Sequence, residues 1–334
     1  MTSRDALRIA RAIYSNNRLY LALCLLLICG TLPLTTNAQS KTWVLPVVHE
    51  EQEYDCADNF AVTDVVARLL WQTFGSVPAH VPTTRISTAP PVEQVKSKTN
   101  PKDGADMIWI PAGEFTMGDD EFTNAKPHTV MLDGYYIYRT PVTVAQYLKF
   151  CEKTGHAIPN AHDFNPNWSK RDHPILNVSY NDALAYCKWA KVKLPTEAQW
   201  EKAARGTDGR KYPWGNTASN DGLSAARPKI YEDGTTPVGS FPLEASPYGV
   251  LDMAGDGYQF CSDWYEANFY TTPLATKRNP ENSSPPKKEK LRVLRGSSWF
   301  LFWDNVAFRT AHRIGVPGDP DAVSGYGFRC VSEK

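Results

Sequence analysis

The stretch Arg292-Val-Leu-Arg-Gly-Ser-Ser-Trp299 carries a short β-rich run into a glycine turn and then into a large aromatic side chain. Near the C-terminus, Gly325-Tyr-Gly-Phe-Arg-Cys330 repeats the combination of glycine, aromatic residue and arginine. Gly296 lets the backbone turn without a Cβ penalty, and Trp299 offers an apolar anchor. We therefore expect the second segment to close a domain that is built around the first.

Length and composition limit the class of protein. The chain has 334 residues, of which 42% are hydrophobic and 12% aromatic, enough for one large domain with a sizeable core, or a domain with a small extension. Its 36 basic and 36 acidic residues cancel, so charge gives no case for nucleic-acid binding. The 25 prolines, 21 glycines and 10 tryptophans indicate a loop-rich fold rather than a helix bundle.

Residues 1–38 have the pattern of an export signal. Four arginines precede a short apolar run at residues 19–30, and Thr36-Asn37-Ala38 offers small residues for cleavage. We expect an exported protein, periplasmic or extracellular, that begins near Gln39. An uncleaved membrane anchor is the alternative, although the run is shorter than the roughly 20 residues of a spanning helix.

Export would change the chemistry of the cysteines. Of seven cysteines, Cys24 and Cys29 would leave with the signal. Those that remain are Cys56, Cys151, Cys187, Cys261 and Cys330. In an oxidising compartment they should pair where geometry allows, and their odd number leaves one over.

Residues 39–104 are expected to lie outside the main domain. Within an N-terminal extension at 39–75, residues 57–74 space their apolar side chains as a helix does, and this helix either packs on the main domain or binds a partner. Residues 76–104 mix proline with threonine, serine and lysine, which is typical of a linker.

Regular structure is expected from residue 105 onward. Alternating apolar residues on both sides of a Pro-Ala-Gly turn in residues 107–118 predict a strand hairpin, and residues 128–137 predict another strand with a turn at Asp133-Gly134. Three helices should follow, because Thr140, Ser179 and Thr196 are suitable N-caps.

The ordered motifs resemble the formylglycine-generating enzyme, or sulfatase-modifying factor, family over residues 105–334. The segments that carry the resemblance are 107–118, 177–187, 194–205, 212–216, 236–241, 248–255, 263–265 and the two quoted stretches. The resemblance implies an α+β fold: a loop-rich variant of the C-type lectin fold, with a few helices around twisted antiparallel sheets, often stabilised by calcium.

The family's catalytic thiols are missing. Its members carry two cysteines beyond the Gly-Ser-Trp turn, which bind copper(I) because soft sulfur ligands select that ion. Counting from the two ends of the motif places them on Leu301 and Val306, or on Phe300 and Asn305. None is a cysteine, so we expect no catalytic residue there and no copper, and we expect the apolar run 300–303 to form core or a pocket wall.

The resemblance also implies a calcium site. Its ligands would be Asp252, the carbonyl groups of Gly255 and Gly257, and Gln259. The family commonly has glutamate at position 259, and a neutral amide weakens such a site. Ordinary turn residues are the alternative interpretation.

The arginines around the two quoted stretches allow two interpretations. They either tie loops together as buried guanidinium groups, or they line a pocket for an anionic ligand together with nearby tryptophans. The candidate pocket residues are Trp299, Trp303, Arg295, Arg309 and Arg313.

A disulfide between Cys187 and Cys330 is implied by a bridged pair in some family members. The positions of a second family bridge fall on Ala204 and Ala311, so this second bridge is lost as a pair. That paired loss supports the alignment of the first pair.

Three functions remain open. The protein could be a binding or structural accessory module for a protein or peptide partner, including a partner at a membrane. It could be a periplasmic oxidoreductase of the same family that uses a different metal or residue set. It could also be a lectin-like ligand binder, since fold alone does not decide function.

Overall fold

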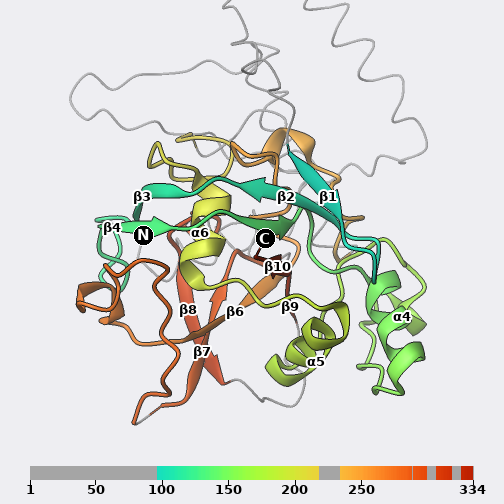
Figure 1. Cartoon of the computed structure of the whole chain (residues 1–334). Coiled ribbons are helices and arrows are strands. Elements are labelled where there is room, and N and C mark those ends of the chain that lie inside the picture. Colours follow the sequence, from blue (N-terminus) through green and yellow to red (C-terminus); the bar gives the residue numbers. More distant parts are fainter. Residues whose placement is uncertain (1–95, 218–233, 288, 299–305, 318–324, 334) are drawn as a thin grey trace, which may run out of the picture. The chain divides into compact units, whose positions relative to one another are not determined.

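A computed structural model describes residues 96–217, 234–287, 289–298, 306–317 and 325–333 (Figure 1). The chain divides into two compact units, 1–86 and 87–334, and all described residues belong to the second. The expected signal at 1–38, the extension at 39–75, and the candidate residues Phe300, Leu301, Asn305, Trp299 and Trp303 lie outside the described residues. Within the described part, no helix has the length and apolar character to cross a membrane.

The first sheet has four antiparallel strands in the order β1-β2-β5-β10. Their bounds are Ser97–Thr99, Asp106–Ile110, Tyr135–Tyr138 and Val331–Ser332. Strand β1 falls within the stretch expected as a linker, because it pairs with β2 from Ser97 opposite Ile108 to Thr99 opposite Asp106. The ordered domain therefore begins earlier than residue 105.

The expected hairpin around the Pro-Ala-Gly turn is not formed. Strand β2 pairs with β5, whereas β3 (Gly113–Met117) pairs with β4 (His128–Leu132) in a separate two-stranded sheet. The chain bends between β2 and β3 instead of reversing. Lys202 holds this bend, since its Nζ donates to the carbonyl oxygens of Pro111 and Gly113 at 2.9 and 2.8 Å.

The described residues include three α-helices: α4 (Val144–Thr154), α5 (Tyr180–Ala190) and α6 (Glu197–Arg205). Each begins with a complete capping box, and the predicted caps Ser179 and Thr196 are confirmed. For α4 the cap is Thr143 rather than Thr140, because Gln146 closes the box on Thr143. Short 3-10 turns lie at Pro166–Trp168, Pro242–Glu244 and Phe269–Thr271.

The two stretches quoted from the sequence meet in the last sheet, whose strand order is β8-β7-β6-β9. The strands are β6 (Tyr258–Trp264), β7 (Leu291–Arg295), β8 (Arg313–Pro317) and β9 (Tyr326–Gly327). Strand β6 lies between β7, which is antiparallel to it, and β9, which is parallel to it. Gly296 turns the chain after β7 at φ 77°, as expected for a position that favours glycine.

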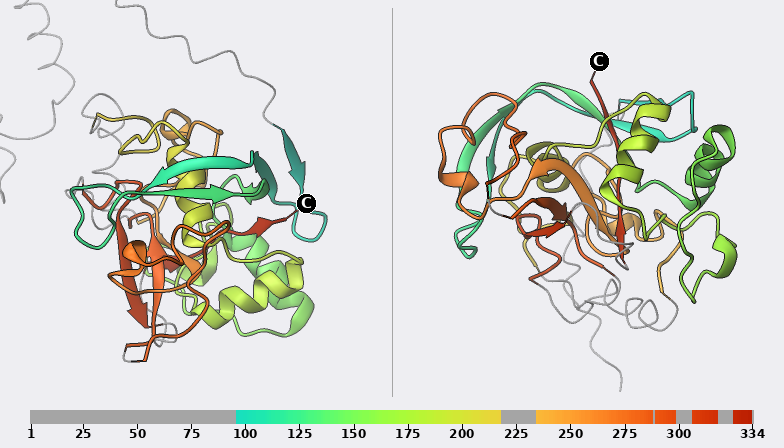
Figure 2. Two further views of the ribbon diagram at one scale, coloured as in Figure 1. Left: turned by 60° about the vertical axis from the view of Figure 1, so that its left-hand side comes forward. Right: turned by 90° about the horizontal axis from the view of Figure 1, so that it is seen from below.

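Helix α6 contacts both the β3–β4 pair and strands β6 and β7 (Figures 1 and 2). One core cluster surrounds α4 and α5, where the rings of Tyr147 and Tyr186 stack at 5.9 Å. A second surrounds α6 and includes Trp200, Cys261 and Val293. Few helices among mixed, mostly antiparallel sheets confirm the predicted α+β class.

Candidate functional site

Beneath the turn at Gly296, buried arginines and glutamates alternate. Arg295, with 0% of its surface exposed, donates from its two terminal nitrogens to Glu197 at 3.0 Å and to Glu201 at 2.6 Å. Arg313 forms a bidentate pair with Glu197 at 2.7 and 2.8 Å. Arg205 pairs with Glu201 at 2.8 Å. We call these five residues the Arg–Glu chain.

The Arg–Glu chain joins α6 to β7 and β8. Burial works against ionisation of Glu197, but the charges of Arg313 and Arg295 outweigh it and hold the pKa of that carboxyl below its ordinary value. The guanidinium groups of Arg295 and Arg313 are thus engaged by buried carboxylates, as the structural interpretation of these arginines requires. The pocket interpretation, which also involves Trp299 and Trp303 outside the described residues, stays a prediction.

Arg309, the third candidate pocket arginine, has other acidic partners. It is partly exposed and pairs with Glu121 at 2.6 Å, which also accepts from Lys211 at 2.5 Å. Arg309 therefore has a different carboxylate partner from Arg295 and Arg313. The sequence signal for their partners is the pair Glu197 and Glu201, four residues apart on the buried face of α6.

Asp263, on strand β6, accepts a hydrogen bond from the N-terminus of α6. Its carboxylate oxygens accept from the backbone N–H groups of Glu197 at 2.7 Å and Asn282 at 2.9 Å. Burial and the nearby charge of Glu197 raise the pKa of Asp263 to about 7. This carboxyl is enclosed and serves to anchor backbone.

The turn expected to bind calcium is organised around a guanidinium group. Oε1 of Gln259 accepts from Nε of Arg329 at 2.6 Å and from the indole N–H of Trp200 at 2.9 Å. The carbonyl oxygen of Asp252 accepts from Gln259 Nε2 at 3.0 Å and from Arg329 at 2.9 Å. Burial lowers the pKa of Arg329 to about 10.

Two of the four expected calcium ligands already accept hydrogen bonds in this arrangement, and the calcium site stays a prediction. The side chain of Gln259 and the carbonyl of Asp252 accept from N–H donors, and Oδ2 of Asp252 accepts from Gly239 N at 2.8 Å. A cation bound here would compete with these N–H donors for the same oxygens and would lie near a buried arginine. Across the described ranges, no group of three or more histidine, cysteine, aspartate or glutamate side chains is placed to hold a metal.

The Sγ atoms of Cys187 and Cys330 lie 3.5 Å apart, and both residues are buried. A disulfide needs about 2.05 Å between the sulfurs, so the pair stands here as two facing thiols and the bridge stays a prediction. Burial, followed by contact with Cys187, raises the pKa of the Cys330 thiol well above its ordinary value.

Of the positions where the family carries its thiols, only Val306 is described. Its side chain is 45% exposed and has no ligand atom. The other described cysteines, Cys151 and Cys261, are buried in different core clusters.

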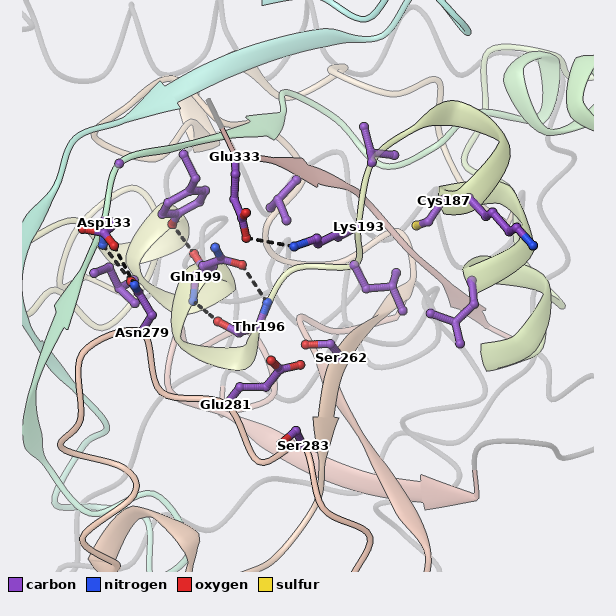
Figure 3. Close-up of a pocket in the computed structure, with 18 of the residues that line it drawn as sticks. Asp133, Cys187, Lys193, Thr196, Gln199, Ser262, Asn279, Glu281, Ser283 and Glu333 are labelled. Carbon is purple, nitrogen blue, oxygen red and sulfur yellow. Dashed lines mark hydrogen bonds and ion pairs between the residues drawn. The ribbon is translucent and has the colours of Figure 1, made fainter.

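A pocket that the sequence did not predict lies between α5, the start of α6, and strands β6 and β7 (Figure 3). Its volume is about 1020 Å³. The turn at Asp133–Gly134 and residues 279–283 complete its walls. We call it the α5–β6 pocket. Its lining comes from segments far apart in the chain, so no local motif marks it.

A cation–π ladder forms one wall of the α5–β6 pocket. The guanidinium carbon of Arg292 lies 3.3 Å from the ring centre of Trp264 and 3.9 Å from that of Tyr180. Arg292 also donates to the backbone carbonyl of Ser262 at 2.9 Å, and so does the Tyr180 hydroxyl at 3.2 Å. These contacts fix the aromatic wall in place.

Comparisons with known proteins agree with this architecture. Residues 93–334 match the model of the sulfatase-modifying factor enzyme 1-like domain. The formylglycine-generating enzyme of Streptomyces coelicolor is 30% identical over 295 residues, covering 70% of this chain and 91% of its own length. Fold and motifs thus define an α+β protein of the formylglycine-generating-enzyme type, a variant of the C-type lectin fold. The chain belongs to the sulfatase-modifying factor family.

Other relatives are larger proteins. The serine/threonine-protein kinase Pkn1 of Chlamydia trachomatis serovar L2 is 32% identical over 250 residues, covering 68% of this chain. The present chain spans only 38% of that kinase's length.

Two solved structures share the fold. PvdO from Pseudomonas aeruginosa has a TM-score of 0.54 at 23% identity, over 71% of this chain and 97% of its own. Treponema denticola variable protein 1 has a TM-score of 0.53 at 22% identity, over 71% and 98%.

Proposed function

We propose that this protein is an exported family member that works as a binding or accessory module and does not generate formylglycine. The observation that carries the proposal is the missing thiol pair. No cysteine lies between Cys261 and Cys330 in the sequence, and the family's chemistry needs two soft sulfur ligands for copper(I). The four described cysteines are all buried, which supports the proposal.

The pattern of residues 1–38 supports export, and with it a periplasmic or extracellular place of action, either free or anchored by that segment. A protein or peptide partner, in some settings at a membrane, fits an accessory module. The likeness to PvdO concerns fold alone, so an oxidoreductase with another residue set gains no support from it.

A lectin-like binder is the second candidate, and the α5–β6 pocket favours it. This pocket combines partly exposed tryptophans with hydroxyl, amide and carboxylate side chains. Such a mixture of apolar surface and a few placed polar groups is typical of a small-molecule site.

The decisive experiment is a search for aldehyde formation. The purified protein is incubated with copper(I), oxygen and a sulfatase-motif peptide, and the peptide is analysed by mass spectrometry. The Streptomyces coelicolor enzyme serves as the positive control. We expect no aldehyde above background. Robust turnover by the present protein would overturn the proposal.

A further inference from the structure

The α5–β6 pocket lies at the start of strand β7. Arg292, near the start of β7, lines the pocket and pairs with Trp264 at the end of β6. The positions of the missing thiols follow Trp299, beyond the end of β7 at Arg295. Val306, the one described position among them, does not line the pocket.

The charges that line the pocket cancel. Three residues are acidic and three are basic: Asp133, Glu281 and Glu333 against Lys188, Lys193 and Arg292. Asp133 is engaged by Asn279 and Arg278, and Lys193 pairs with Glu333 at 3.0 Å. A polyanion such as a nucleotide gains no net electrostatic attraction from a lining whose charges balance. An apolar ligand would bury the charged side chains of the lining, which costs free energy.

An extended peptide is also disfavoured. Peptides that add to a sheet need a strand edge with open backbone groups. At the pocket, the edge of β10 is closed by Lys193, whose backbone exchanges hydrogen bonds with Val331 at 2.9 and 2.8 Å.

What the pocket does offer is aromatic surface beside hydroxyl-binding groups. Trp109 and Trp264 are partly exposed, and the guanidinium of Arg292 holds the ring of Trp264 in place. Figure 3 shows Glu281 and Ser283 across the pocket from Lys193 and Glu333, with Ser262 between them. The apolar C–H face of a sugar ring packs on aromatic rings, and its hydroxyl groups bond to carboxylates and hydroxyls.

Two side chains at this wall lack partners among the described residues. The buried Oγ of Ser262 has no hydrogen bond within the described structure. Glu281 is exposed, and its carboxylate makes no hydrogen bond or ion pair with a described residue. An enclosed hydroxyl without a partner is costly unless a ligand or water completes it.

We infer that the α5–β6 pocket binds a neutral oligosaccharide, with Trp109 and Trp264 contacting sugar rings and Glu281 and Ser262 bonding to hydroxyl groups. The inference rests on the lectin-like candidate function and names its ligand class. A volume of about 1020 Å³ accommodates several sugar rings.

The test begins with the full exported protein on an array that carries neutral and anionic glycans. Isothermal titration then measures the strongest neutral glycan against Glu281→Gln, Ser262→Ala and the matched control Glu114→Gln, which changes an exposed carboxylate on β3. We expect Glu281→Gln to weaken binding about tenfold, since a charge-assisted hydrogen bond becomes a neutral one. Ser262→Ala should weaken it several-fold, and the control should not change it.

The inference is overturned if no neutral glycan binds, if binding is confined to anionic glycans, or if the pocket variants bind as tightly as the unaltered protein. None of these results bears on aldehyde formation, so the proposal of a non-catalytic family member is judged separately.

Discussion

Arg329 donates from Nε to Oε1 of Gln259 over 2.6 Å, inside the turn where the family's calcium ligands would lie. The same guanidinium group donates to the carbonyl oxygens of Leu251 and Asp252 at 2.8 and 2.9 Å. A positive side chain thus organises the carbonyl oxygens of Leu251 and Asp252 at the start of this turn. The turn is held by hydrogen bonds that require no metal.

Thermal stability should therefore not depend on calcium. We expect Tm in excess chelator and in millimolar calcium to agree within about 1 °C, because only an ion that binds the folded state raises stability. Differential scanning calorimetry makes the comparison, with magnesium as the control for ionic strength. A rise of several degrees that is specific to calcium would show that the protein binds the ion.

The second prediction concerns the Arg–Glu chain. Glu197→Gln removes the carboxylate that Arg313 and Arg295 share, and leaves two buried guanidinium groups short of charge. We expect a loss of about 3–5 kcal/mol in the free energy of unfolding. Glu114→Gln, on an exposed face of β3, should change it by less than about 0.5 kcal/mol. Urea unfolding measures both, and equal stability of the two variants would contradict this role for the chain.

Acid should act through the same carboxylate. The folded-state pKa of Glu197 lies below its unfolded value, so its contribution is fully present above about pH 4.3 and is lost as pH falls through the folded value. Glu197→Gln should flatten the fall of stability below pH 4. If the free energy of unfolding of this variant falls with pH as steeply as that of the unaltered protein, other groups cause the acid unfolding.

Asp263 should make stability change with pH in the opposite direction to Glu197. Its pKa is raised to about 7 in the folded protein, against about 3.9 in an unfolded chain. The folded state then holds the proton more tightly, so stability falls as pH rises between these two values and levels off above them. Asp263→Asn should remove this decline, whatever its effect on stability at low pH. Unfolding measured at intervals from pH 4 to 8 tests the slope.

Local signals in the sequence were sufficient to predict the helices. They did not predict which strands pair, because that depends on residues far apart in the chain. Ser179 and Thr196 cap their helices because a capping box is formed within four residues. The strand that pairs with β2 is β5, which begins at Tyr135. The Pro-Ala-Gly turn alone does not reveal whether the chain reverses or bends after β2. Lys202, which holds that bend, lies about 90 residues away.

The candidate functional site was also only partly predictable, because local motifs name residues but do not show their partners. The facing cysteines and the arginines were named from motifs, but the interpretation of Arg295 and Arg313 required knowing that Glu197 and Glu201 point inward from α6. No pattern in the sequence indicated the α5–β6 pocket. Its aromatic side chains come from Trp109, Tyr180 and Trp264, which only the fold brings to one surface.

Export is testable directly. We expect the mature protein from its native host to lack residues 1–38, because the basic and apolar segments precede small residues at 36–38. Intact-mass analysis reads the cleavage point. A protein that retains residues 19–30 would be membrane-anchored instead.

The last prediction is a disulfide between Cys187 and Cys330 in the exported protein. Their sulfurs lie 3.5 Å apart, so a small side-chain rotation would allow the bond, and the two residues are 143 positions apart. Closing so long a loop stabilises the folded state by about 4–5 kcal/mol in the chain-entropy account, less any strain. The bond would tie the C-terminal segment to α5. A double Cys187→Ala/Cys330→Ala variant should lose this stabilisation and no longer respond to reductant, whereas the unaltered protein should respond. Non-reducing peptide mapping identifies the pairs, and free thiols at both positions, or bonds from either to Cys56, Cys151 or Cys261, would refute the assignment.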